Sequence, residues 1–335
     1  MFGDAPCSQA ALVDENGSPV YLTPKMDKQE EIYTQAMQYL DDAIADLQKE
    51  DLIDPGAQDL LYQGDAEKWL KLAYGLKARY TMHLLKRSAN KDADMEKVLE
   101  YVDNSFESAE EQAAFDVYDA NNINPLYGFF VARAGLGASE SMRSKLAEYN
   151  DPRLSRAFIT KQGASGKEQA PGTADNAVYA PNGTPEQGTS KYGTSLFMYS
   201  ISAPTLLLSY HELKFLEAEA LCRLERDAKS ALKDAVVAGL LNAENSFTIS
   251  RKELGKTLIN AASSITEAEA ESYFDNTIEA KYTAEPLKTT MIQKYFALWG
   301  ASGEATESYN DVRRMKGLGE NFIELKNPNS FPLRC

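Results

Sequence analysis

The sequence contains few of the residues from which disulfide frameworks and metal sites are built. Its 335 residues include three cysteines and two histidines. Cys7, Cys222 and Cys335 are odd in number and far apart, so we expect no disulfide framework, and Cys222 lies at an apolar helical position that suits a free thiol. His83 and His211 each lack a second ligand at metal-binding spacing, so the sequence predicts no metal site and no cofactor.

Basic clusters and long apolar runs are also absent from the sequence. Asp and Glu total 50 against 35 Lys and Arg, which gives a formal net charge of −15. This charge would repel a nucleic acid or an anionic lipid surface. No window approaches the roughly 20 apolar residues that a membrane-spanning helix needs. We therefore expect no nucleic-acid partner and no spanning helix in this sequence.

Apolar residues recur instead at helical spacing. Hydrophobic residues make up 43% of the sequence, enough to fill the core of a globular chain. The stretch 202–224 combines a helical apolar period with small residues, Ala218 and Ala220, where another helix can approach closely. It predicts a long helix that is packed on more than one side, and we take it as the middle of a helical stack.

The other periodic segments predict further helices on both sides of this one. Four of them are defined by their apolar period, at 27–49, 92–106, 139–149 and 291–299. Three more begin at the N-cap candidates Asp65, Asp227 and Thr266, and a short helix ends at 314. Two segments lack a clean period, 115–130 and 160–194, and the second is rich in Gly, Pro, Ser, Thr, Asn and Gln. We expect 160–194 to be a long loop, which is more often functional than decorative.

These patterns predict an all-α fold of tetratricopeptide-like helix pairs with long irregular loops. We expect one domain over 1–335 with three parts. Helix pairs occupy 1–114, a loop-rich part that is a candidate ligand region occupies 115–201, and further helix pairs occupy 202–335.

Several short motifs occur in order along nearly the whole chain. They are Phe2-Gly3-Asp4-Ala5-Pro6, Gly64-Asp65-Ala66-Glu67-Lys68-Trp69, Asn124-Pro125-Leu126-Tyr127, Asn150-Asp151-Pro152-Arg153-Leu154, Tyr210-His211-Glu212-Leu213, Gln293-Lys294-Tyr295-Phe296, Asp311-Val312-Arg313-Arg314 and Phe331-Pro332-Leu333-Arg334. Each is weak singly. Together the chain resembles the SusD/RagB family of nutrient-binding outer-membrane lipoproteins of Bacteroidetes.

The resemblance implies a SusD-like fold, an N-terminal lipid anchor and a surface-exposed place at the cell outer membrane. It also implies a partner, a TonB-dependent (SusC-like) transporter that imports glycans or peptides and on which the protein docks as a lid. The signal peptide, the lipid-bearing cysteine and the first helical pair of the family are not found in this sequence. Contact with the membrane is therefore expected only through a lipid anchor outside this chain, and Cys7 is no lipidation site because no apolar run precedes it.

Aromatic and amide residues of the loop-rich part are the candidate ligand contacts. An aromatic ring stacks on the apolar C–H face of a sugar, and amides bond its hydroxyl groups. Four tyrosines lie in Asn-, Gln- and Gly-rich segments that lack the helical apolar period of a buried face. The candidate set is Tyr118, Asn121, Asn122, Tyr127, Tyr179 and Tyr192. Tyr127 belongs to a family motif, so a structural role is an alternative for it.

The sequence gives no support for catalysis. With 50 carboxylates some pair will fall at a glycosidase-like separation by chance, and no nucleophile stands out. The segment 116–122 alternates oxygen ligands but lacks the Gly and closing Glu of a calcium loop. Arg153, Arg313 and Arg334 are interpreted as structural partners of carboxylates or carbonyls. We therefore expect a non-catalytic protein that binds an oligosaccharide; the alternatives are a peptide ligand, a plain helical-repeat interaction scaffold, or a glycoside hydrolase.

Overall fold

The computed structural model describes residues 3–50, 53–133, 136–162, 167–169, 178–183, 192–259, 261–300 and 303–325. Its helices are α1 (Gln29–Leu47), α2 (Ala66–His83), α3 (Lys91–Asp103), α4 (Pro125–Arg133), α5 (Glu140–Glu148), α6 (Leu154–Ala157), α7 (Tyr210–Arg223), α8 (Lys229–Leu254), α9 (Glu267–Tyr273), α10 (Glu279–Ala284), α11 (Pro286–Ala297) and α12 (Ala305–Leu318). The fold is mainly helical, as predicted. The motif at 331–334, with Arg334, and Cys335 lie outside the described residues.

Short strands complete the described part of the fold. They are β1 (Ala113–Phe115), β2 (Phe158–Gln162), β3 (Lys167–Gln169), β4 (Thr194–Ser195), β5 (Thr205–Leu208) and β6 (Leu258–Ile259). β1 pairs with β5 in an antiparallel ribbon, and the other four form a small sheet in the order β4-β2-β3-β6.

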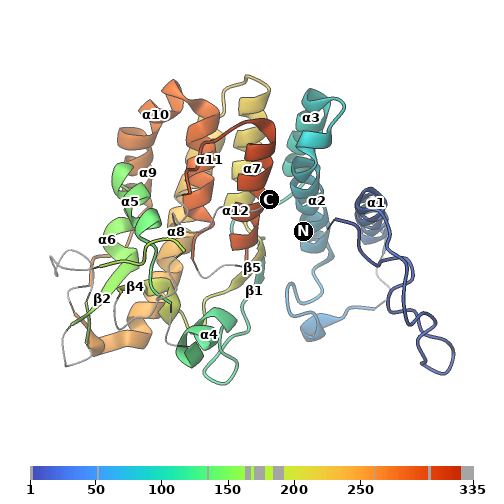
Figure 1. Ribbon diagram of the computed structural model, residues 1–335, viewed down its shortest axis with the longest axis horizontal. Coiled ribbons are helices and arrows are strands. Elements are labelled where there is room, and N and C mark those ends of the chain that lie inside the picture. The colour runs from blue at the N-terminus through green and yellow to red at the C-terminus, as the bar shows by residue number, and fades with distance from the viewer. Residues whose placement is uncertain are drawn as a thin grey trace.

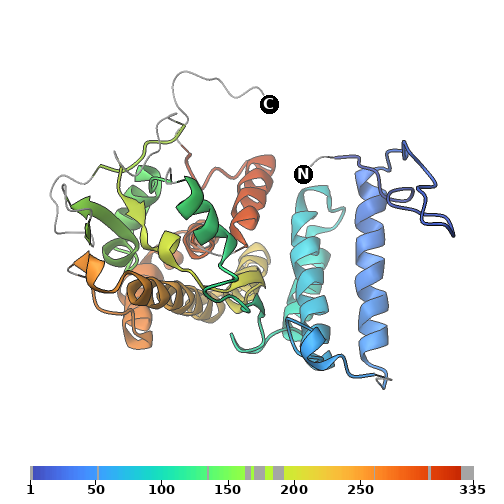
Figure 2. The same cartoon turned by 90° about the horizontal axis from the view of Figure 1, so that it is seen from below.

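The helices form a row that can be followed across Figures 1 and 2. α1 stands at one edge beside α2, and α2 packs on α3. α7 follows, in contact with α3 and α2 on one side and with α8 and α11 on the other. The small sheet, α5 and α6 lie at the end opposite α1 (Figure 1).

α7 separates two hydrophobic cores and contributes to both. Leu213 and Leu216 pack with Met82, Val98 and other side chains of α2 and α3. Phe215 and Ala218 face the second core, which α8, α9 and α11 share. The prediction that this helix is central and buried on more than one side is confirmed.

The start of α7 differs from the sequence prediction. The helix begins at Tyr210 rather than near 202, because Thr205–Leu208 is the strand β5 paired with β1. Pro204 disfavours a helical conformation at Ala203, and the run that follows it finds a strand partner in β1. The Ser209 side chain accepts a hydrogen bond from the Glu212 amide and caps the helix.

Two segments without a helical period also carry structure. Residues 125–133 form α4, so the expectation of irregular chain over 115–130 is wrong for its last part. The strands β2 and β3 and a bridge between Ser139 and Ala180 occupy parts of 160–194, so that segment is not wholly a loop. The strand pairs join residues distant in sequence, which a local period does not reveal.

The predicted caps are largely confirmed. Asp65 accepts a hydrogen bond from the Lys68 amide at 3.1 Å, and Thr266 accepts one from the Glu269 amide at 3.2 Å. Asp227 lies one residue before the N-cap position of α8 and bonds the Lys229 amide at 3.0 Å. Each satisfies an amide that the first turn of a helix leaves without an intrahelical partner.

α1 has an unusual place for a helix of 19 residues. Its predicted apolar stripe is half-buried against α2, and none of its side chains is fully buried. α1 therefore contributes less to the core than α2, α3 or α7. No helix of the described part is long and apolar enough to cross a membrane.

Trp299 tests the packing of the second core. Its ring stacks on Phe158 with 5.3 Å between the ring centroids and meets Phe197 edge-on at 5.1 Å. We expect Trp299→Ala to lower the free energy of unfolding by about 3 to 5 kcal/mol, because the cavity it leaves removes contacts on both sides. Chemical denaturation measures this loss. The exposed Tyr39 is the control, for which Tyr39→Ala should change stability by about 0.5 kcal/mol or less. A loss below about 1 kcal/mol for Trp299→Ala would contradict this packing.

Candidate ligand-binding site

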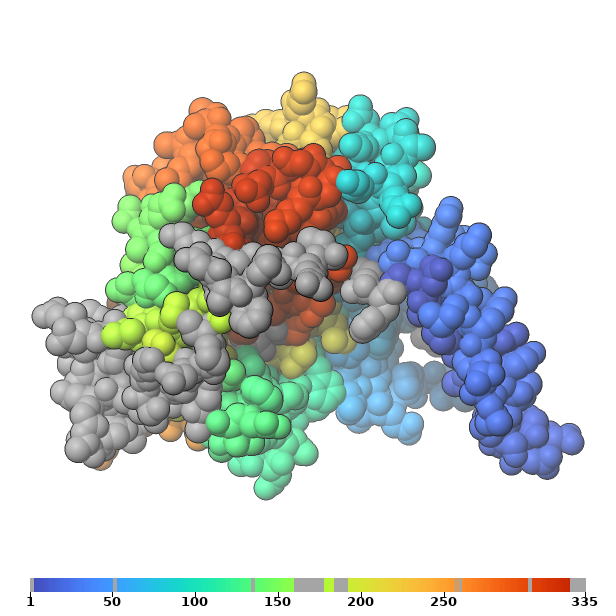
Figure 3. Space-filling model, viewed as in Figure 1, coloured from blue at the N-terminus to red at the C-terminus, as the bar shows by residue number. Residues whose placement is uncertain are grey.

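The segment 116–133 connects β1 to the end of α4 and carries four of the six predicted contacts. It projects at the lower edge of the face shown in Figure 3, where α4 lies in Figure 1. Tyr118 and Tyr127 are partly exposed and Asn121 and Asn122 are exposed. The structure therefore brings these four residues into one segment of the surface.

A turn around Asp119 holds the two asparagines outward. The Asp119 carboxylate accepts hydrogen bonds from the Asn121 and Asn122 amides, both at 2.7 Å, and the Asp119 amide donates to the Asn122 carbonyl at 2.9 Å. The bonds from the Asn122 and Asn121 amides lower the pKa of Asp119, because they stabilise its ionised form. The backbone is thus fixed while the asparagine side chains stay available to a ligand.

Asn124 fastens this segment to the helical part of the protein. Its amide donates to the Ile201 carbonyl at 2.8 Å, and its side-chain Nδ2 donates to the Ala203 carbonyl at 2.8 Å. Its Oδ1 accepts from the Leu126 amide at 2.8 Å and so caps α4. Asn124, the first residue of the motif Asn124-Pro125-Leu126-Tyr127, therefore has a structural role. A structural role for this motif was one of the two interpretations that the sequence left open.

The two tyrosines are positioned differently. The Tyr118 hydroxyl bonds Thr205 Oγ1 at 2.9 Å, and its ring meets Phe115 edge-on. Partial burial raises the pKa of Tyr127, and the charge of Glu253 raises it further. Tyr118 is thus held against the β1–β5 ribbon, whereas Tyr127 lies near the end of α8.

Exposed apolar side chains beside these residues were missed by the sequence prediction. Phe129 and Val131 on α4 are 50% and 58% exposed, and the Arg133 guanidinium lies 5.7 Å from the Phe129 ring centroid. Val117, Ile123 and Leu207 of β5 are also exposed. A signal was present, because α4 reads Pro-Leu-Tyr-Gly-Phe-Phe-Val-Ala-Arg and is apolar on every face.

The expectation that all four loop tyrosines are exposed is wrong for Tyr179 and Tyr192. They are 3% and 7% exposed. The Tyr179 ring packs edge-on against Phe158, and Arg143 lies 5.2 Å from its centroid. Backbone bonds join the chain around Ala138, Ala180 and Gly193, so these short segments form a layer over the core. Their partners come from distant residues, which is why no local stripe predicted the burial.

The structure also shows the surroundings of the arginines that were interpreted as structural. Arg153 is buried and makes a two-pronged ion pair with Asp151 at 2.8 and 2.6 Å, which confirms a structural role. The carboxylate partners expected for Arg313 belong instead to its neighbour Arg314, which is buried and pairs with Glu219 and Asp311, whereas Arg313 is exposed and lies over the ring of Tyr309. Among the residues that the structure describes, no group of three or more His, Cys, Asp and Glu is placed to hold a metal ion.

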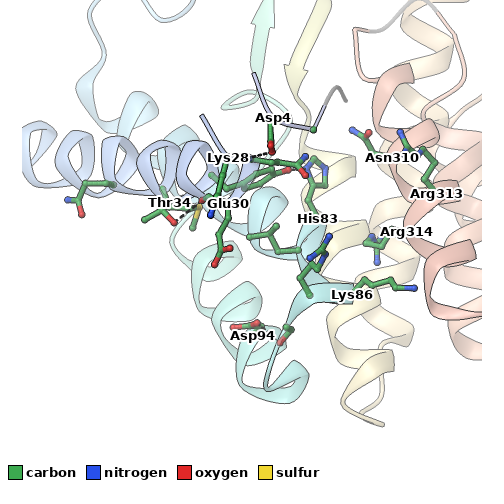
Figure 4. A pocket seen from close by; sticks show the side chains of 18 of the residues that line it. Asp4, Lys28, Glu30, Thr34, His83, Lys86, Asp94, Asn310, Arg313 and Arg314 are labelled. Atoms are coloured by element: carbon green, nitrogen blue, oxygen red, sulfur yellow. Dashed lines mark hydrogen bonds between the residues drawn. The ribbon is translucent and has the colours of Figure 1, made fainter. Parts of the chain in front are cut away.

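A separate cleft of about 1270 Å³ lies between α1, the C-terminal end of α2, and α12. In Figure 4, Lys28 and Glu30 lie at one side of it and Asn310 and Arg313 of α12 at the other. Its described lining carries charges of both signs, and Tyr33 is the one Phe, Tyr or Trp among these lining residues. This lining suits a sugar-stacking surface less well than the segment 116–133 does.

His83 joins three helices at this cleft. Its Nδ1 lies 3.3 Å from the Tyr33 hydroxyl of α1, and its Nε2 lies 2.6 Å from the Glu307 carboxylate of α12. Burial alone would raise the pKa of Glu307, but the hydrogen bond and charge of His83 outweigh it and lower the pKa. His83 is thus a structural tie between α1, α2 and α12.

The model of the SusD-like family, described as "Starch-binding associating with outer membrane", matches residues 1–319. None of the curated proteins compared with the chain matches it. A crystal structure of a SusD/RagB family protein from Bacteroides thetaiotaomicron is 64% identical with a TM-score of 0.92, and the match covers 98% of this chain and 68% of that one.

Two more distant structures share the fold. A SusD homologue from Bacteroides fragilis is 20% identical with a TM-score of 0.72, over 94% of this chain and 67% of its own. A protein described as chitin-binding is 22% identical with a TM-score of 0.66, over 93% of this chain and 64% of its own. The chain thus spans about two thirds of the length of these relatives. The SusD-like fold prediction is confirmed.

Asn124 provides the test of how the candidate site is held. Asn124→Ala leaves the buried Ala203 carbonyl without this donor and removes the cap of α4, so we expect stability to fall by about 1 to 3 kcal/mol. Asn122→Ala, at an exposed side chain of the same segment, should change stability by about 0.5 kcal/mol or less. Urea denaturation of both variants measures the difference. Equal losses would show that Asn124 does not anchor the segment.

Proposed function

The chain belongs to the SusD-like family, and from that premise we propose that it binds an oligosaccharide without cleaving it and delivers it to a TonB-dependent outer-membrane transporter. The family description names starch binding and association with the outer membrane. The chitin-binding relative shares this fold at 22% identity. Glycan binding is thus the function that the comparisons favour over a plain interaction scaffold.

The segment 116–133 is the proposed glycan platform. The observation that carries this is the pair of exposed amides, Asn121 and Asn122, held outward by the Asp119 turn between the partly exposed rings of Tyr118 and Tyr127. Rings supply flat apolar faces and amides supply donors and acceptors for hydroxyl groups, which is the chemistry that a sugar needs. Rigid support by the backbone lowers the entropy lost on binding.

Two adjustments to the candidate set follow from the structure. Tyr179 and Tyr192 are buried, so we restrict the proposed contacts to Tyr118, Asn121, Asn122 and Tyr127. Phe129 extends the apolar surface on α4 by an exposed ring and is the natural addition to the platform.

The proposed partner is a SusC-like transporter at the outer membrane, and the support for it is the family description of outer-membrane association. The test is co-purification of the full-length protein from detergent extracts of outer membranes. We expect a TonB-dependent barrel to be recovered with it in stoichiometric amount. Recovery of the protein alone, in a mild detergent at low salt, would argue against the partnership.

Ring removal is the sharpest test of the platform. Tyr118→Ala should weaken binding of maltoheptaose or chitohexaose by about 1 to 3 kcal/mol, by analogy with aromatic stacking on flat ligands. Tyr118→Phe keeps the ring and loses only the bond to Thr205, so it should retain most of the affinity. Isothermal titration calorimetry measures affinity, and the melting temperature of each variant reports whether folding has changed.

A matched control lies outside the platform. Tyr309→Ala removes an exposed ring on α12 and should leave glycan affinity unchanged. If Tyr118→Ala, Tyr127→Ala and Phe129→Ala all bind both sugars as the unaltered chain does, the platform lies elsewhere. If the unaltered chain binds neither sugar but binds peptides, the ligand class is wrong.

We also expect that the chain does not hydrolyse the oligosaccharide that it binds. Because no nucleophile or acid–base pair stands out, the purified chain should release no reducing ends from maltoheptaose or chitohexaose during prolonged incubation. Reducing-sugar assays measure this. Release that disappears on changing one carboxylate to its amide would show a hydrolase instead.

A further inference from the structure

Glu304 is a buried carboxyl group at the start of α12. It is 2% exposed and lies immediately before the helix. Its Oε1 accepts a hydrogen bond from the Ser209 amide at 2.6 Å and lies 3.7 Å from Arg79 Nη2. Its Oε2 lies 3.5 Å from His211 Nε2. Glu304 thus joins α12 to α2 and to the beginning of α7.

Arg79 serves two carboxyl groups at this point. It makes a two-pronged ion pair with Glu212, with Nε–Oε1 at 2.8 Å and Nη2–Oε2 at 2.5 Å, and Glu304 approaches the same guanidinium. Both carboxyl groups therefore lie beside the same Nη2 atom, Glu212 Oε2 at 2.5 Å and Glu304 Oε1 at 3.7 Å. Two buried carboxyl groups that share one guanidinium do not both ionise readily, because each negative charge disfavours the other and one arginine neutralises only one of them.

His211 does not provide a compensating positive charge at neutral pH. It is 1% exposed, and burial lowers the pKa of His211 to about 4. In the described part of the structure its Nε2 has no hydrogen-bond partner, although Glu304 Oε2 is 3.5 Å away. A neutral imidazole nitrogen without a hydrogen is an acceptor, and a protonated Glu304 carboxyl group places a donor 3.5 Å from it.

We propose that Glu304 and His211 hold one proton between them at neutral pH, and that this proton fastens the N-terminal end of α12 to α7 and α2. Glu304 is then a carboxylic acid whose Oε1 accepts from the Ser209 amide and whose Oε2 carries the proton toward His211 Nε2. Loss of the proton leaves a second buried carboxylate against Glu212, and α12 is the element that separates to relieve it.

The surrounding charged groups are already matched in pairs. The groups that share this buried layer are Arg79 and His83 of α2, Asp151 and Arg153 before α6, Glu212 and Glu219 of α7, Lys294 of α11, and Glu307, Asp311 and Arg314 of α12. Each acid of this list lies in an ion pair with a base of the same list. Burial and the Glu212 charge raise the pKa of Glu304 well above its ordinary value, in agreement with the proton count.

The proton count sets the pH dependence of stability. Between the ordinary pKa of glutamate, 4.5, and that of histidine, 6.5, the unfolded pair carries one proton on the imidazole. The folded pair carries one proton on the carboxyl group, so it gives no pH dependence in this range. Above pH 6.5 the unfolded pair has lost its proton and the folded pair has kept it. The stabilising contribution is therefore lost as the pH rises, and the unfolding constant increases by about tenfold per pH unit.

The experiment compares the whole chain with its Glu304→Gln variant at several pH values from 6.5 to 9, by chemical denaturation. Glutamine has the size of glutamate and cannot titrate. The ratio of the two unfolding constants, unaltered chain over variant, is expected to rise by about tenfold per pH unit, since other titrating groups cancel in the ratio. A ratio that does not change with pH would overturn the proposal.

Glu307→Gln is the matched control on the same helix. Glu307 lies near His83, its pKa is lowered, and it is ionised in both folded and unfolded chains above pH 6.5. This variant should be less stable by a constant factor, with the same pH dependence as the unaltered chain. If Glu307→Gln removes the pH dependence, the proton belongs to a different group and the proposal is wrong.

Two further measurements keep the proposal testable if Glu304→Gln does not fold. At pH 8 the infrared spectrum of the folded, unaltered chain should contain a carboxylic-acid carbonyl band that vanishes on unfolding, since a carboxyl group of ordinary pKa is ionised at this pH. Absence of this band overturns the proposal.

Hydrogen exchange should show that the amide protection factors of α12 fall as the pH rises, while those of α8 do not. Equal behaviour of the two helices would contradict the role assigned to α12.

Discussion

The arrangement of the helices depends on two buried carboxylates of α7. Glu212 and Glu219 are both fully buried and lie two turns apart, so they face the same way. Glu212 binds Arg79 of α2, and Glu219 binds Arg314 of α12 with an Nη2–Oε2 distance of 2.8 Å. Burial alone would raise the pKa of both, and the arginine charges reverse this and lower it. Such pairs add little net stability, but a missing partner typically costs about 3 to 5 kcal/mol, so the three helices have to assemble in this one register.

The candidate site derives its rigidity from the same helix. Asn124 bonds the carbonyls of Ile201 and Ala203, only a few residues before β5 and the Ser209 cap of α7. Tyr118 bonds Thr205 on β5 itself. The segment 116–133 is therefore fastened to the chain that leads into the central helix, and a ligand there would meet a surface whose backbone is already ordered.

Much of the fold could be predicted from local patterns. The caps at Asp65 and Thr266 and the apolar stripes of the long helices depend on side chains three or four residues apart, and the structure confirms them. The surface of the proposed platform was predicted less completely. The aromatic and amide composition favoured Tyr118 and Asn122, which remain proposed contacts, but the exposure of Phe129 beside them was not expected because an apolar helix is normally assigned to the core.

The sequence by itself determined the helical class, the capped helix starts and the family resemblance, because each rests on residues close together or on motifs in fixed order. Tertiary structure decided where α7 begins, since β5 exists only when β1 lies beside it. It also decided that Tyr179 and Tyr192 are buried, since the segments that cover them are distant in sequence. The partner of Glu212 was likewise undetermined, because any of the 35 basic residues satisfies the charge and only the packing of α2 on α7 selects Arg79.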